Sequence, residues 1–148
     1  MPTRPFDSLQ MSASASELSP STQGAASRSR VFVVDDDPTI CRALERLLRS
    51  AGHVVETFGS AEAFLERSPR PASGALILDV RMPGMSGIEL QRHLVAQGFR
   101  PRILFLSSVD DPRTRSTALA EGALAWFSKP LDAEALLAAL DLDRSAEL

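Results

Sequence analysis

The sequence contains little of what several classes of protein require. Among its 148 residues Cys41 is the only cysteine, so no disulfide can form within the chain and the cytoplasm is the expected compartment. No apolar run approaches the ~20 residues of a membrane-spanning helix. The polar segment 1–10 also lacks the apolar stretch of a secretory signal. We therefore expect no membrane association.

An excess of charge of one sign is also missing. The chain has 16 basic and 19 acidic residues and a net charge of −3. This balance offers no basic field for neutralising phosphates, so we expect protein partners rather than direct contact with nucleic acid. Lys129 is the only lysine, and the other 15 of these basic residues are arginines.

The length suits one domain with a sizeable core but not two. Residues 1–30 are rich in Ser, Ala and Pro, a composition that cannot offset the entropy of ordering, and we predict a disordered N-terminal tail there. The single domain is expected over residues 31–148.

From residue 31 onward, short apolar runs alternate with stretches of helical periodicity. The runs predict strands at 31–34, 54–58, 75–80, 103–107 and 124–127, and the periodic stretches predict helices at 38–51, 60–66, 86–97, 112–121 and 132–142. Five such units predict an α/β fold, in which helices cover both faces of a parallel sheet.

Polar residues follow the predicted strands at the edge where such sheets bind ligands. They are the acidic run Asp35, Asp36 and Asp37, then Asp79, Ser107 and Lys129. Carboxylates gathered there suit a hard cation such as Mg²⁺, and a carboxylate beside the cation can attack a phosphoryl group. The group therefore indicates an aspartyl-phosphate site.

Several of these residues also have a purely structural explanation. Acids before a helix often cap it, and a serine such as Ser107 often lies in a turn. Asp79 is harder to explain in this way, because it ends a strongly apolar strand and must be solvated, paired or metal-bound.

Two segments, 33–38 (VVDDDP) and 79–87 (DVRMPGMSG), resemble the receiver domains of response regulators in two-component signalling. Ser107 and the pair Lys129-Pro130 match the family's later motifs. The sequence separations also agree with the family pattern: 44 positions from Asp35 to Asp79, 28 from Asp79 to Ser107 and 22 from Ser107 to Lys129. The resemblance covers residues 31–142. It implies a flavodoxin-like sheet in the order 2-1-3-4-5, which a chemotaxis member of the family exemplifies.

The resemblance also implies roles for individual residues. Asp79 would accept a phosphoryl group from a histidine kinase or phosphotransfer protein, and Ser107 and Lys129 would bind its oxygens. Ser107 and Trp126 would form the conformational switch, although Trp126 stands where Tyr or Phe is more usual and ordinary packing explains it equally well. Asp37 would serve the helix start. The Mg²⁺ ligands would be Asp35, Asp36, Asp79 and the backbone carbonyl of Arg81.

Beyond Lys129 the chain has no segment large enough for a separate output domain. We therefore expect a stand-alone receiver that signals by contact with a downstream protein, and that is no enzyme beyond assisting its own phosphotransfer and dephosphorylation. The helix expected at 132–142 would cover the sheet and offer its edge to a partner or to a second copy, as a homodimer.

Two other readings remain open. Residues 35–39 (DDDPT) also fit the opening motif of haloacid-dehalogenase-type phosphatases, with Asp35 as the nucleophile. That family needs a further acidic pair after the lysine, which is missing at a strand end here, and it leaves Asp79 unexplained. A phosphorylation-independent module with a receiver-like fold is disfavoured because all five site positions are intact.

Overall fold

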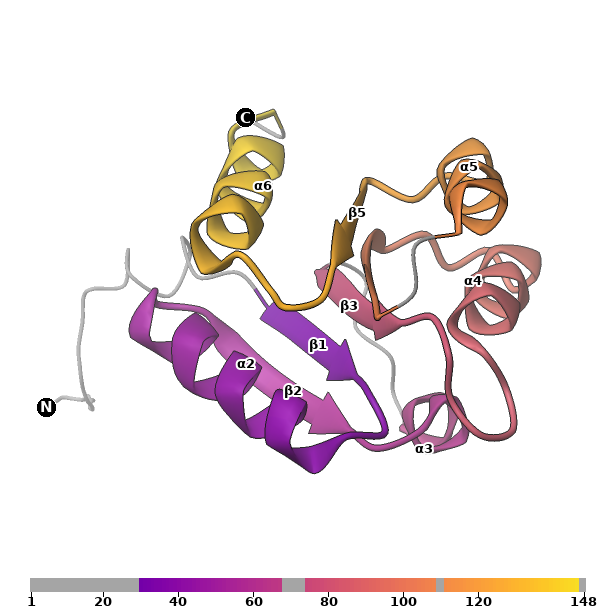
Figure 1. Ribbon diagram of the computed structural model, residues 1–148, viewed down its shortest axis with the longest axis horizontal. Coiled ribbons are helices and arrows are strands. Elements are labelled where there is room, and N and C mark those ends of the chain that lie inside the picture. The colour runs from indigo at the N-terminus through magenta and orange to yellow at the C-terminus, as the bar shows by residue number, and fades with distance from the viewer. Residues whose placement is uncertain (1–29, 68–73, 109–110, 147–148) are drawn as a thin grey trace, which may run out of the picture.

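A computed structural model of the chain describes residues 30–67, 74–108 and 111–146, with side chains described up to residue 141 (Figure 1). The expected disordered tail at 1–30 lies outside these residues except for Arg30, which already belongs to the first strand. The loop expected at 69–74 is likewise outside them apart from Gly74.

One parallel sheet forms the centre of the molecule, and its strand order β2-β1-β3-β4-β5 confirms the predicted fold. The strands are β1 (Arg30–Val34), β2 (Val54–Phe58), β3 (Ala75–Asp79), β4 (Arg102–Ser107) and β5 (Ala125–Ser128). Each strand lies within a residue or two of its predicted position. The continuous apolar runs predict this arrangement because strands of a parallel sheet are buried on both faces.

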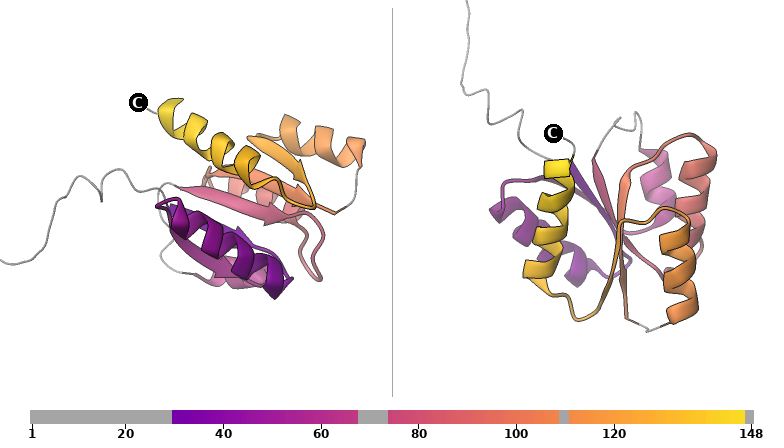
Figure 2. Two further views of the ribbon diagram at one scale, coloured as in Figure 1. Left: turned by 60° about the vertical axis from the view of Figure 1, so that its left-hand side comes forward. Right: turned by 90° about the horizontal axis from the view of Figure 1, so that it is seen from above.

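Helices cover both faces of the sheet, as Figure 2 shows. Helices α2 (Pro38–Ser50) and α6 (Ala133–Ala146) lie on one face, and α3 (Ala61–Glu66), α4 (Gly87–Ala96) and α5 (Pro112–Ala120) lie on the other. The longest of these, α6, has 14 residues, and no helix in the described part of the chain could cross a bilayer.

Alternate residues of the central strands supply the two halves of the core. In β3, Leu76 and Leu78 pack toward α3, α4 and α5, whereas Ala75 and Ile77 pack toward α2 and α6. All five β3 residues are buried. Asp79, the last of them, is therefore a carboxylate at the end of a fully buried strand.

Side-chain caps determine where four helices begin. The caps are Asp37 for α2, Ser60 for α3, Ser86 for α4 and Asp111 for α5. Each side chain accepts a hydrogen bond from a backbone N–H group of the first turn, which would otherwise lack a partner. All four caps belong to loops that follow a strand, at the carboxyl edge of the sheet.

Candidate functional site

The carboxyl ends of β1, β3, β4 and β5 bring the predicted site residues to one edge of the sheet. The register pairs Val34 with Leu78, so Asp35 and Asp79 occupy equivalent positions on neighbouring strands. Ser107 ends β4, and Lys129 directly follows β5. This geometry arises because the strands are parallel and of similar length, so their ends meet at one edge.

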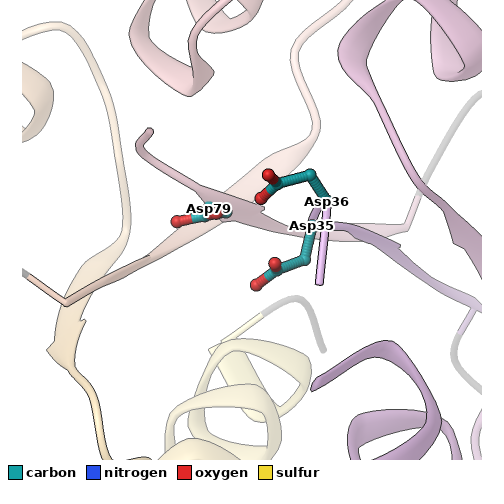
Figure 3. A group of neighbouring side chains, drawn as sticks. All are labelled: Asp35, Asp36 and Asp79. Carbon is teal, nitrogen blue, oxygen red and sulfur yellow. The ribbon is translucent and has the colours of Figure 1, made fainter. Parts of the chain in front are cut away.

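Three carboxylates meet at this edge, those of Asp35, Asp36 and Asp79 (Figure 3). One oxygen from each lies within 4.8 Å of the others. Asp35 and Asp79 are buried, with 1% and 5% of their surfaces exposed, whereas Asp36 is exposed. An all-oxygen donor set open on one side suits a hard divalent cation such as Mg²⁺, which retains water ligands.

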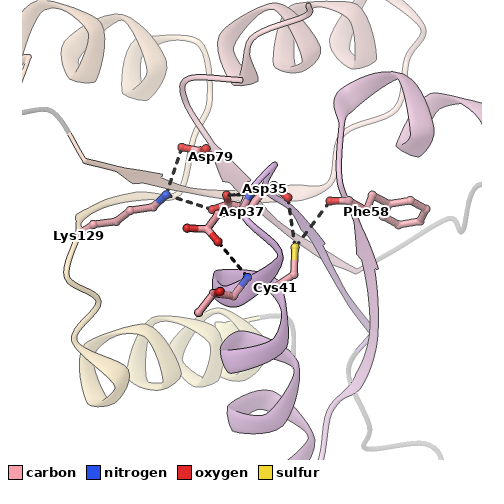
Figure 4. A network of polar contacts seen from close by, with 7 residues as sticks. Asp35, Asp37, Cys41, Phe58, Asp79 and Lys129 are labelled. Carbon is pink, nitrogen blue, oxygen red and sulfur yellow. Dashed lines mark hydrogen bonds and ion pairs between the residues drawn. The ribbon is translucent and has the colours of Figure 1, made fainter. Parts of the chain in front are cut away.

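Lys129 reaches both buried carboxylates from the end of β5 (Figure 4). Its Nζ lies 3.1 Å from Oδ2 of Asp35 and 3.5 Å from Oδ1 of Asp79. Since its own side chain is only 19% exposed, water screens these interactions weakly. The ammonium therefore partly balances the charge that the two carboxylates bring into the protein.

Backbone and side-chain contacts hold the Asp35 turn in place. The N–H of Asp37 donates to Oδ1 of Asp35 at 2.9 Å, and the N–H of Asp35 donates to the carbonyl of Phe58 at 3.1 Å. The buried Cys41 thiol donates to the Asp35 carbonyl at 3.2 Å, a contact drawn in Figure 4. Asp37 itself accepts from the N–H of Thr39 as the cap of α2, which is the role expected from the sequence.

Electrostatics distinguish Asp79 from an ordinary aspartate. Burial, followed by the Asp35 charge, raises the pKa of Asp79 from 3.8 to about 6, while the Lys129 charge and a hydrogen bond from the Arg81 backbone oppose the shift. Burial also lowers the pKa of Lys129, but the hydrogen bond and charge of Asp35, helped by the Asp79 charge, outweigh it and raise this pKa overall. Three carboxylates and one ammonium thus leave an excess of negative charge at this edge of the sheet.

The start of α4 packs directly against the backbone of Asp79. A Cβ atom at Gly87 would lie 2.3 Å from the Asp79 carbonyl oxygen, closer than any side chain can approach. Glycine at this position therefore allows the helix to begin beside the buried end of β3.

Ser107 and Trp126, the expected switch residues, lie on neighbouring strands. Ser107 is 3% exposed, and its carbonyl accepts a hydrogen bond from the N–H of Lys129 at 2.7 Å. Trp126 is partly buried, and its ring centroid lies 5.8 Å from that of Phe105 on β4. The indole thus packs on the face of the sheet covered by α3, α4 and α5.

Sequence reasoning missed three contacts around this site. They are the Cys41 thiol on the Asp35 carbonyl, the close approach of Gly87 to Asp79, and a hydrogen bond from the N–H of Met85 to Glu62 at 3.0 Å. Gly87 and Gly84, the two glycines of the 79–87 segment, were the visible signals, for the approach to Asp79 and for the contact with Glu62. The side chains of Cys41 and Glu62 themselves follow no distinguishing pattern.

Known proteins resemble this chain over the same region. The model of the response regulator receiver domain matches residues 31–141. The response regulator protein TodT of Pseudomonas putida is 44% identical over 112 residues, which cover 76% of this chain and 49% of TodT. The transcriptional regulatory protein TdiR of Thauera aromatica is 40% identical over 120 residues, covering 78% of this chain and 53% of TdiR. This chain spans about half the length of these curated relatives.

Solved structures agree with this assignment. FixJ-N is 31% identical with a TM-score of 0.70, over 80% of this chain and 94% of that one. A response regulator receiver protein from Burkholderia phymatum is 39% identical with a TM-score of 0.68, over 80% of this chain and 96% of that one. Family model, relatives, strand order and acidic edge all agree, and the chain belongs to the response regulator receiver domain family of two-component signalling.

Proposed function

We propose that this receiver accepts a phosphoryl group on Asp79 in a Mg²⁺-dependent reaction and passes the signal on by protein contact. The donor would be a phosphohistidine of a histidine kinase or phosphotransfer protein. Asp35, Asp36, Asp79 and the Arg81 carbonyl would hold the cation. Ser107 and Lys129 would bind the phosphoryl oxygens, and Ser107 with Trp126 would couple the site to the surface.

The observation that carries this proposal is the environment of the Asp79 carboxylate. It lies buried at the end of β3, within 4.8 Å of oxygens from Asp35 and Asp36 and 3.5 Å from the Lys129 ammonium. In such a place an oxygen of Asp79 can attack phosphorus as the P–N bond of the phosphohistidine breaks, with the bonding pair leaving on the imidazole nitrogen. When bound, Mg²⁺ would supply positive charge next to the phosphoryl oxygens.

Residues of the chain would do the remaining work. The Lys129 ammonium, 3.5 Å from Asp79, is positioned to stabilise negative charge that moves onto the transferred group. Burial excludes bulk water from Asp79, which strengthens this interaction and slows hydrolysis of the product. Lys129 would then exchange part of its contact with Asp35 for a phosphoryl oxygen.

The phosphatase alternative fits the geometry less well. Asp35, its required nucleophile, is 1% exposed, and its two carboxylate oxygens already accept hydrogen bonds from Asp37 and Lys129. Within the described ranges, the acidic cluster at this edge consists of Asp35, Asp36 and Asp79, so no acidic residue that follows Lys129 in the sequence belongs to it.

Acid-labile labelling tests the proposal directly. We expect acetyl phosphate with Mg²⁺ to label the protein on Asp79, as mapped by reductive cleavage of the acyl phosphate and mass spectrometry. Asp79→Asn should abolish the label, whereas Asp37→Asn, which removes an equal charge from the cap of α2, should retain it. Label on Asp35, or undiminished label in Asp79→Asn, would support the phosphatase instead.

The wider setting follows from the family. A cytoplasmic location for this chain, a histidine kinase or phosphotransfer partner and a downstream protein target are part of the proposal, and a homodimer through α6 is an alternative mode of output. Capture of a binding protein by the Mg²⁺–beryllofluoride form, but not by the metal-free form, is the expected result for a messenger.

A further inference from the structure

The loop that follows Asp79 is closed at its base. The N–H of Val80 donates to the Leu106 carbonyl at 3.1 Å, which extends the pairing of β3 with β4 by one residue. The N–H of Gly87 then donates to the Val80 carbonyl at 3.0 Å, so the chain returns to its starting point before α4 begins. Residues 81–86 therefore form a short loop whose two ends are fixed beside the site.

A carboxylate from a different element holds the tip of this loop. Oε2 of Glu62, in the first turn of α3, accepts a hydrogen bond from the N–H of Met85 at 3.0 Å. A Cβ atom at Gly84 would lie 2.7 Å from the same oxygen, and Gly84 has a φ of +78°, which glycine adopts most readily. The absence of a side chain at Gly84 thus lets the Glu62 carboxylate reach the loop backbone.

The same loop contacts the proposed phosphoacceptor. The backbone N–H of Arg81 donates a hydrogen bond to the Asp79 carboxylate. The backbone carbonyl of Arg81 is the ligand that the proposed function assigns to the cation. The next residue, Met82, is buried in the core. The Arg81 peptide therefore lies between a fixed base and a tip that is hydrogen-bonded to Glu62.

We propose that Glu62 is a positioning residue for the cation and phosphoryl site, acting through the 81–86 loop without touching either group. This inference rests on the proposed function of Asp79. Glu62 is exposed, so its hydrogen bond competes with water and contributes little to global stability. It favours one orientation of the loop backbone, as outer-sphere residues do at many metal sites.

Three variants on one helix test this inference. Glu62→Ala removes the acceptor, and Glu62→Gln keeps an oxygen that can accept from Met85. The matched control is Glu66→Ala, which removes an exposed carboxylate one turn further along α3. Mn²⁺ binding, measured by electron paramagnetic resonance of the free ion, reports on the site without needing phosphorylation. The rate of acetyl phosphate labelling as a function of Mg²⁺ concentration reports on function.

We expect Glu62→Ala to weaken Mn²⁺ binding about five- to tenfold and to raise the half-saturating Mg²⁺ concentration similarly, with a smaller effect on the maximal rate. Glu62→Gln should stay within about twofold of the parent, as should Glu66→Ala. Equal affinities for Mn²⁺ in Glu62→Ala and Glu66→Ala would overturn the inference. Equal losses of Mn²⁺ affinity in Glu62→Ala and Glu62→Gln would also overturn it, because they would show that the charge of Glu62 matters and its hydrogen bond does not. If the parent is not labelled on Asp79, the proposed function fails while the Mn²⁺ comparison still decides the role of Glu62.

Discussion

The Lys129 ammonium lies 3.1 Å from a carboxylate oxygen of Asp35, although 94 positions separate the two residues in the chain. This distance is shorter than the 3.5 Å from the same nitrogen to Asp79, the proposed phosphoacceptor. The lysine therefore lies nearer to Asp35, at the end of β1, than to Asp79, at the end of β3. Its position next to Asp79 makes it available to a phosphoryl group after a small shift.

Replacing Lys129 by methionine should separate cation binding from phosphotransfer. The ammonium competes with a cation for the same two carboxylates, so we expect Lys129→Met to bind Mg²⁺ about three- to tenfold more tightly at pH 8. The labelling rate should nevertheless fall, because charge on the transferred group loses its partner. Calorimetric titration and acetyl phosphate kinetics measure the two effects, with Lys129→Arg retaining the charge as control. Weaker Mg²⁺ binding in Lys129→Met would contradict this view of the ion pair.

Stability without metal should depend on the protonation of Asp79. Its pKa in the folded state is about 6, above the ordinary value of 3.8, so folding favours the protonated form. The stability that protonated Asp79 adds to the folded state is fully present below about pH 4 and is lost as pH rises through about 6. We expect a loss on the order of 2 kcal/mol across this window.

Urea unfolding in chelator at pH 4 and pH 8 measures this dependence. Asp79→Asn should be more stable than the parent at pH 8 and should lose less stability between the two pH values. An identical pH dependence in the two proteins would show that Asp79 titrates normally.

Neighbouring aspartates of the acidic run should differ in their effect on metal affinity. Asp36→Asn removes one of the three clustered carboxylates, and we expect the affinity for Mg²⁺ to fall about tenfold or more. Asp37→Asn removes the same charge from the next residue but keeps a side chain that caps α2, so its effect should be below about threefold. Calorimetry at fixed ionic strength compares the pair, and equal losses would mean that only the total charge matters.

Trp126 should report on the occupied site by its fluorescence. It is the only tryptophan, it packs against Phe105, and Lys129 follows three residues later. We expect its emission to change when beryllofluoride and Mg²⁺ bind, because a switch at Ser107 and Trp126 would alter the surroundings of the indole. Asp79→Asn provides the control with no acceptor. Constant emission through a saturation shown by calorimetry would argue that Trp126 serves packing alone.

Adding one methyl group at Gly87 should disturb the site through the backbone. The new Cβ would lie 2.3 Å from the Asp79 carbonyl oxygen, so we expect Gly87→Ala to lower the free energy of unfolding by about 2–3 kcal/mol and to slow labelling. Gly59→Ala is the matched control, because nothing lies within 4 Å of its added methyl group. Chemical denaturation of both variants tests this, and equal stabilities would contradict the close approach.

The fold, and which residues lie together at one edge of the sheet, could be predicted from the sequence. Apolar runs such as 75–78, buried on both faces, require a parallel sheet, and a parallel sheet brings the residues that end its strands to one edge. Asp35, Asp79, Ser107 and Lys129 could therefore be predicted to lie together, and the motif at 79–87 indicated the family. The cap formed by Asp37 was also predictable, because it depends only on residues a few positions away.

How these groups interact could not be predicted, because it depends on how distant elements pack. The pairing of Lys129 with Asp35, the burial that raises the pKa of Asp79, and the reach of Glu62 to the loop at Met85 all depend on distances between elements far apart in the chain. Periodicity and composition record which side of an element faces the core. They do not record side-chain reach or the local dielectric environment, because both arise only when strands, helices and loops pack against one another.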